Sequence, residues 1–100
     1  MIKQIMPEEV FQQLKDGQKL SLIDVREDEE VAEGMISEAK HIPLGQLEDR
    51  INEISKDEEH IMICRSDGRS GKACKLLKAK GFKVKNMVGG MLTWEAKYGK

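Results

Sequence analysis

Hydrophobic positions along the chain alternate between short apolar runs and longer stretches in which apolar residues recur every three or four positions. The short runs predict strands, because they are rich in β-branched residues and too short for free-standing helices. They lie at residues 20–25, 60–63 and 82–88. The spacing of three and four predicts amphipathic helices at residues 46–54 and 68–80, each with one face against a sheet.

Signals at helix ends add further helices to this pattern. Pro7 stands at a first helical position with acidic residues in the first turn, and Gly17 ends that helix. The acidic residues 27–33 predict a short, solvent-exposed helix. Residues 91–97 predict a last helix, on which Trp94 packs inward.

Strands that alternate with helices are typical of an α/β domain with a largely parallel sheet. A chain of 100 residues has room for one such domain, which we expect to span residues 1–100. Its 39% hydrophobic and 35% charged residues suit a folded domain with a soluble surface. Open parallel sheets bind their ligands beyond the carboxyl ends of the strands, so candidate functional residues are sought there.

Charge and composition exclude several classes of function. Basic residues number 17 and acidic ones 18, so the net charge of −1 gives no overall field that attracts nucleic acid or an anionic membrane. No apolar run approaches the roughly 18 residues of a membrane span, and the first residues lack the apolar core of a signal peptide. We therefore expect a cytoplasmic protein. Two cysteines and two scattered histidines predict free thiols, no metal site and no cofactor.

The strongest chemical signal is Cys64, which follows the predicted strand 60–63. The five residues after it are all polar, charged or glycine, and a helix is predicted to start near Gly68. Such a turn can aim successive N–H groups at one point, where the dipole of the helix also favours negative charge on sulfur. Arg65 and Arg69 add positive potential, so we expect Cys64 to be a thiolate near neutral pH and a nucleophile.

Either cysteine could also be a small buried hydrophobic residue, which is the commoner role of a lone cysteine. The polar residues that follow Cys64 favour the functional interpretation at that position. Cys74 lies inside the predicted helix beside Ala73, where a small apolar residue fits, and we interpret it as structural.

Three separated motifs resemble those of the rhodanese family, and the resemblance covers nearly the whole chain. LIDVR at residues 22–26 is similar to an early strand that ends in Asp-x-Arg, and VGGMLTW at residues 88–94 is similar to a closing Gly-Gly-x-x-x-Trp element. The Cys64 loop lies between them in the family's order. A fourth segment resembles a turn-shaping pattern from which it departs at Met35, Ser37, Glu38 and His41.

The resemblance implies a three-layer α/β fold, with a central, mostly parallel sheet of about five strands and helices on both faces. It also implies a sulfurtransferase, in which the Cys64 thiolate takes sulfane sulfur from thiosulfate or a persulfide. The resulting Cys64 persulfide gives that sulfur to a thiol acceptor or to cyanide. The expected partners are a small anionic sulfur donor and a protein that donates or accepts sulfur, and we expect a monomer.

Specific residues are assigned by the same resemblance. The substrate-binding loop comprises Arg65, Ser66, Asp67, Gly68, Arg69 and Ser70. Its N–H groups are expected to hold the outer sulfur, while Ser66 and Asp67 orient the loop. Asp24 and Arg26 match a motif at the adjacent strand end, and we expect them to brace the loop.

Two other interpretations stay open. Protein tyrosine phosphatases also place a Cys thiolate in an anion-binding loop, but with five residues between the Cys and an Arg that clamps phosphate. Here Arg69 comes after four residues and Ser70 occupies the position of that arginine, which disfavours a small-anion phosphatase or reductase. The alternative to an enzyme is an interaction module, a sensor thiol or a sulfur relay with little turnover.

Overall fold

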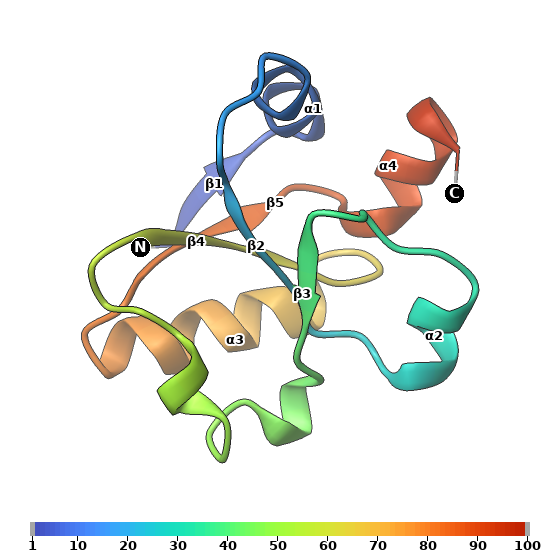
Figure 1. Ribbon diagram of the computed structural model, residues 1–100. Coiled ribbons are helices and arrows are strands. Elements are labelled where there is room, and N and C mark those ends of the chain that lie inside the picture. Colours follow the sequence, from blue (N-terminus) through green and yellow to red (C-terminus); the bar gives the residue numbers. More distant parts are fainter. Residues whose placement is uncertain (1, 100) are drawn as a thin grey trace.

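The computed structural model describes residues 2–99. Within these residues, five parallel strands form one sheet in the order β1–β5–β4–β2–β3 (Figure 1). The strands are β1 (Lys3–Ile5), β2 (Ser21–Asp24), β3 (Ala39–His41), β4 (Glu59–Ile63) and β5 (Lys83–Met87). The helices are α1 (Pro7–Lys15), α2 (Asp28–Ala32), α3 (Gly68–Ala79) and α4 (Gly90–Tyr98). The predicted α/β fold with a parallel sheet is confirmed.

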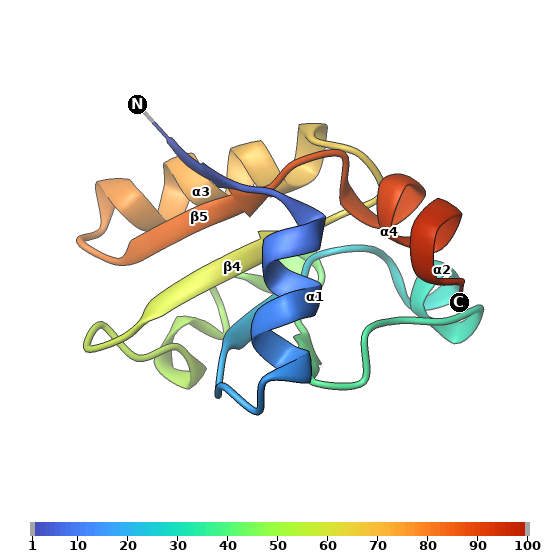
Figure 2. The same ribbon diagram turned by 90° about the horizontal axis from the view of Figure 1, so that it is seen from above.

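Side chains that alternate along the strands divide the core into two layers. Leu22 and Ile23 of β2 are both buried but belong to opposite apolar clusters, and Ile61 and Met62 of β4 do the same. Helix α3 covers one face of the sheet, whereas α1 and α4 pack on the other (Figure 2). The sheet therefore lies between two layers of helices, as the three-layer prediction requires.

An aromatic cluster joins α1 to α4. Phe11 stacks on Tyr98 with ring centroids 3.9 Å apart, and Trp94 lies 5.9 Å from the Phe11 ring and 4.9 Å from the Tyr98 ring. Each such pair contributes about 1 kcal/mol beyond the area it buries. Trp94 is only 8% exposed, which confirms the predicted inward packing, and the cluster holds α4 firmly against the sheet.

Two strands carry no recognisable signal in the sequence. β1 and β3 have three residues each, and only Ile5 among their side chains is buried. Both are edge strands, at opposite ends of the strand order. Since an edge strand needs little apolar sequence, neither produces the apolar run by which β2, β4 and β5 were predicted.

The prediction of an α-helix over residues 46–54 is wrong. Two 3₁₀ helices, Leu44–Gln46 and Ile51–Glu53, occupy this region, and most of its backbone bonds span three residues. A nine-residue segment is too short to be a stable α-helix by itself, and Asp and Asn in it favour turns. The apolar face was predicted correctly, because Leu47 and Ile54 are buried against α3 and the sheet.

The parallel register brings several strand ends to one edge of the sheet. Asp24, the last residue of β2, pairs with Ile63, the last residue of β4. Asn86 of β5 pairs with Met62 of β4, one residue earlier. Cys64 follows Ile63 directly, so it lies at the same carboxyl edge as Asp24 and Asn86.

No helix formed by residues 2–99 is long and apolar enough to cross a membrane.

Candidate active site

Cys64 lies at the base of the loop that connects β4 to α3. Its side chain continues the alternation of β4 and points to the α3 face, in the same apolar cluster as Met62 and Ala73. The residue is only 1% exposed, and its Sγ lies 3.2 Å from Oγ of Ser70 in the first turn of α3. The sulfur is therefore held between the strand end and the helix start, as the sequence predicts.

The N-terminus of α4 supports the loop from behind. The N–H of Met91 donates to the carbonyl of Cys64 at 2.8 Å, and the N–H of Leu92 donates to the carbonyl of Arg65 at 2.9 Å. This close contact depends on Gly90, whose φ is +57°. A Cβ atom at Gly90 would lie 2.4 Å from the Cys64 carbonyl oxygen and 2.5 Å from that of Ser66, so no other residue fits without moving the loop.

The loop N–H groups have no acceptor in the part of the chain that the structure describes. Backbone N–H groups from Arg65 to Ser70 make no hydrogen bond within residues 2–99, whereas Gly71 N–H donates to the Asp67 carbonyl. In a trans peptide the N–H points away from the carbonyl, so the N–H groups of Arg65 and Ser66 point away from α4. The loop therefore combines unpaired donors with the N-terminus of α3, which favours an anion there.

A buried network of hydrogen bonds links the loop to β5. Ser70 Oγ donates to Asn86 Oδ1, and Asn86 Nδ2 donates to Asp67 Oδ1 at 3.0 Å. The same carboxylate oxygen accepts from the N–H of Gly89 at 2.9 Å, which is the loop-orienting role predicted for Asp67. Asn86 Nδ2 also donates to Gln4 of β1. The network fixes both ends of the loop.

Sequence reasoning missed Asn86. It is 4% exposed and stands next to the buried Met87, so its side-chain amide must be satisfied inside the protein. An amide next to an apolar residue in a predicted strand was the signal that could have found it. Ser66, in contrast, is exposed.

Asp24 and Arg26 form a buried ion pair beside the site. Arg26 donates to both carboxylate oxygens of Asp24, at 3.0 Å from Nε and 2.9 Å from Nη2, and the pair is 0% and 4% exposed. Arg26 Nη2 also donates to the carbonyl of Gly34, just beyond α2, at 2.8 Å. His41 Nε2 lies 2.6 Å from the Arg26 carbonyl. The pair thus braces the segment that carries α2. Within residues 2–99 its side chains make no hydrogen bond to the Cys64 loop, so the bracing of that loop stays a prediction.

Arg69 is not an isolated cation. Its guanidinium makes two hydrogen bonds to Glu30 of α2, Nη1 to Oε1 at 2.5 Å and Nη2 to Oε2 at 2.8 Å. The bonds from Arg69 lower the pKa of Glu30 to about 2. Glu30 in turn raises the pKa of Arg69. Arg65, by comparison, is exposed.

Cys74 lies behind the site and is 0% exposed. Burial raises its pKa to about 12. Both cysteines are free thiols. Cys74 packs with Ala73 and Leu77 on the face of α3 that meets the sheet, which agrees with the structural role predicted for it.

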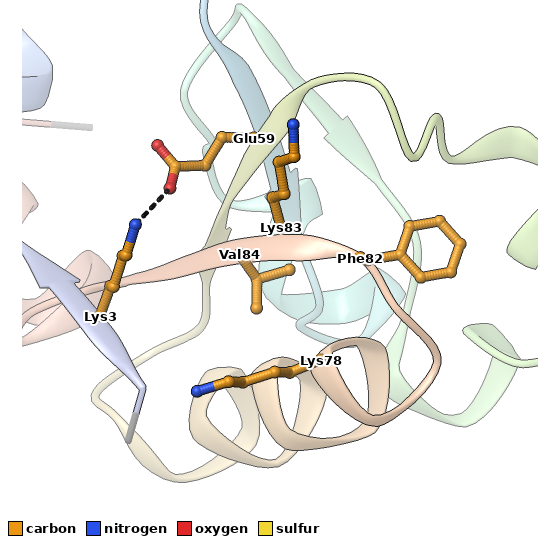
Figure 3. A pocket seen from close by; sticks show the side chains of 6 residues that line it. All are labelled: Lys3, Glu59, Lys78, Phe82, Lys83 and Val84. Atoms are coloured by element: carbon orange, nitrogen blue, oxygen red, sulfur yellow. Dashed lines mark ion pairs between the residues drawn. The ribbon is translucent and has the colours of Figure 1, made fainter.

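Two cavities, one at each end of the parallel strands, differ in the charge of their lining residues. One of about 220 Å³ lies between α2 and α4 next to the Cys64 loop, lined by Arg26, Glu30, Glu33, Arg65, Met91, Leu92 and Glu95. The other, of about 240 Å³, lies where β1, β4 and β5 begin (Figure 3). Its lining residues are Lys3, Glu59, Lys78, Phe82, Lys83 and Val84. Three lysines and one glutamate line the cavity away from Cys64, whereas three glutamates and two arginines line the cavity next to the Cys64 loop.

Within residues 2–99, no group of three or more His, Cys, Asp or Glu side chains is placed to hold a metal ion.

Comparison with known proteins identifies relatives over almost the full chain. The model of the rhodanese-like domain matches residues 6–97. A Bacillus subtilis protein named "Putative sulfurtransferase YtwF" is 47% identical over 94 residues, which are 94% of this chain and 91% of that protein. "Putative sulfur carrier protein YrkF" of the same organism is 40% identical over 97 residues, which are 96% of this chain and 52% of that protein. The crystal structure of a rhodanese-like domain protein from Staphylococcus aureus is 35% identical, with a TM-score of 0.89 over 93% of this chain and 91% of that one.

Proposed function

The chain belongs to the rhodanese-like domain family, and on that premise we propose that it transfers sulfane sulfur through a persulfide on Cys64. The observation that carries the proposal is the arrangement of the loop. Cys64 Sγ lies at its base, and the N–H groups from Arg65 to Ser70 have no acceptor within residues 2–99. Preorganised donors of this kind stabilise a negative charge that develops during a reaction. The relatives named sulfurtransferase and sulfur carrier support the same chemistry.

The reaction takes place in two displacements. The Cys64 thiolate attacks the outer sulfur of a donor such as thiosulfate or a persulfide, a new S–S bond forms, and sulfite or a thiolate leaves with the electron pair of the broken bond. An acceptor thiolate or cyanide then attacks the outer sulfur and releases the Cys64 thiolate. Charge and electrons balance in each displacement, so no cofactor is needed.

The loop contributes in both steps. Its N–H groups hold the terminal sulfur, which carries the negative charge of the persulfide. The Ser70 hydroxyl lies 3.2 Å from Sγ and can turn from Asn86 to donate to the thiolate that each step consumes or regenerates. Arg69 is engaged by Glu30 and lies one position early for a phosphate clamp, which disfavours a phosphatase.

The test is to incubate the protein with thiosulfate or a persulfide, measure its intact mass, and then add cyanide and assay thiocyanate. We expect a gain of one sulfur that cyanide removes. The gain should be absent from Cys64→Ser and present in the matched control Cys74→Ser. If the wild type gains no sulfur from either donor but hydrolyses a phenyl phosphate ester, the proposal is wrong.

A sulfur relay is the second candidate, because one relative is named as a sulfur carrier. A relay also forms the Cys64 persulfide, but it passes the sulfur to a protein thiol and turns over slowly with cyanide. Single-turnover transfer much faster than steady-state turnover would identify the relay. Either form of the activity needs Cys64 as a free thiol between transfers, and a cytoplasmic location, where thiols are kept reduced, is part of the proposal.

A further inference from the structure

The arginines around Cys64 are largely neutralised by carboxylates. Arg26 is bound by Asp24, and Arg69 is bound by both carboxylate oxygens of Glu30. Arg65 lines a cavity whose other charged residues include Glu33 and Glu95. A donor that enters from this side therefore meets at least as many negative as positive charges.

Glu30 is built into this position by α2. It is the third residue of the helix, and its carboxylate accepts the N–H of Glu27 at 2.9 Å while also binding Arg69. The Arg69 bonds hold the pKa of Glu30 at about 2, so the carboxylate is charged at any physiological pH. Arg69 is therefore already in an ion pair with Glu30 before a donor binds.

We propose that Glu30 makes the site select sulfur donors by their charge. By engaging Arg69, it disfavours thiosulfate, a dianion, and favours persulfides that carry a single negative charge. This inference rests on the proposed sulfur transfer. It follows because Arg69 is the charged side chain closest in sequence to the Ser70 that contacts Cys64. Because Glu30 cancels most of the positive charge of Arg69, the pair attracts a second anion only weakly. The lysine-rich cavity at the opposite edge of the sheet cannot compensate (Figure 3).

The chemistry is the same for both donors. With thiosulfate the Cys64 thiolate forms the S–S bond and sulfite leaves with two negative charges. With a persulfide the same bond forms and a thiolate leaves with one. Only the charge that the site must accommodate differs, and a negative side chain near the donor opposes two charges more strongly than one.

The test measures kcat/KM for sulfur transfer to cyanide with two donors, thiosulfate and the persulfide of 2-mercaptoethanol, whose only charge is on the persulfide. The variant is Glu30→Gln, which removes the charge but keeps a residue suited to the third position of the helix, where Gln accepts the same N–H. The matched control is Glu29→Gln. Glu29 has the same charge on the same helix, is exposed, and makes no ion pair with any residue from 2 to 99.

In Glu30→Gln we expect kcat/KM to rise about tenfold for thiosulfate and about threefold for the persulfide, because a released Arg69 attracts two charges more strongly than one. The wild-type value with thiosulfate should also rise with ionic strength more steeply than that of the variant, since salt screens the repulsion. Glu29→Gln should change neither donor appreciably.

An equal change for both donors, or the same change in Glu29→Gln, would overturn the assignment of donor charge to Glu30. In either case the Cys64 persulfide still forms, so the proposed function stands. Loss of the persulfide from the wild type with both donors is a different result, and it would overturn the proposed function itself.

Discussion

Substitution of Gly90 by alanine tests the contact between α4 and the Cys64 loop. Gly90 has a φ of +57°, and an added Cβ would lie 2.4 Å from the Cys64 carbonyl oxygen and 2.7 Å from the carbonyl carbon of Arg65. These are backbone atoms, so they cannot rotate away. The loop and the start of α4 must separate, and the bonds from Met91 and Leu92 to the loop carbonyls must lengthen.

The expected loss of stability follows from these contacts. Left-handed backbone costs alanine about 1–2 kcal/mol, and two weakened hydrogen bonds cost about 1 kcal/mol each, so Gly90→Ala should lose about 3–4 kcal/mol. For a domain of this size that loss lowers Tm by roughly 12 °C or more. Movement of the loop by about 1 Å should also slow persulfide formation by about a hundredfold.

Gly17→Ala is the matched control. Gly17 has a φ of +83°, but no atom lies within 4 Å of an added Cβ, so this variant carries the backbone strain alone. Its loss should be about 1–2 kcal/mol, with normal persulfide formation. Thermal unfolding followed by circular dichroism and persulfide formation followed by mass spectrometry measure both effects. Equal losses of stability in the two variants, or normal persulfide formation in Gly90→Ala, would refute the conclusion that α4 holds the Cys64 loop in place.

Three further predictions concern the thiols, the buried amide and the acid side of the stability curve. Iodoacetamide should alkylate Cys64 much faster than Cys74 at neutral pH, because burial raises the pKa of Cys74 to about 12; peptide mass spectrometry after timed quenching measures this, and equal rates would contradict it. Asn86→Leu should lower the free energy of unfolding in urea by about 2–3 kcal/mol, because Ser70 and Gln4 lose their partner; an unchanged midpoint would show that the network is dispensable. Because the pKa of Glu30 is lowered from 4.5 to about 2, its pair with Arg69 stabilises the fold above pH 4.5, and this stabilisation is lost as the pH falls towards 2. The difference in the free energy of unfolding between wild type and Glu30→Gln should therefore shrink from pH 4.5 to pH 2. A constant difference over that range would exclude this linkage.

Local features of the site could be predicted from the sequence. The position of Cys64 follows from an apolar strand that gives way to a polar turn, and the start of α3 follows from the pattern after Gly68. Both depend on neighbouring residues, and the structure places them as expected. The packing of Cys74 and Trp94 was equally predictable, since each lies on the apolar side of a helix.

Long-range partners could not be predicted in the same way. Glu30 lies 39 residues before Arg69, in a segment whose sequence predicts a solvent-exposed acidic helix. No residue near Arg69 in the sequence indicates that the two form an ion pair. Asn86 meets Asp67 and Ser70 only because β5 lies beside β4 in the sheet. A single sequence gives the apolar faces of elements but not the order of strands, and these contacts depend on that order.

The support that α4 gives to the Cys64 loop has a consequence for synthesis. The ribosome makes Cys64 before Gly90 and the rest of α4, whose N–H groups hold the loop carbonyls. Because domains this small fold as units, a growing chain that stops short of α4 exposes a cysteine in an unformed loop. The loop that holds Cys64 is therefore complete only after α4 has been made and has docked on it.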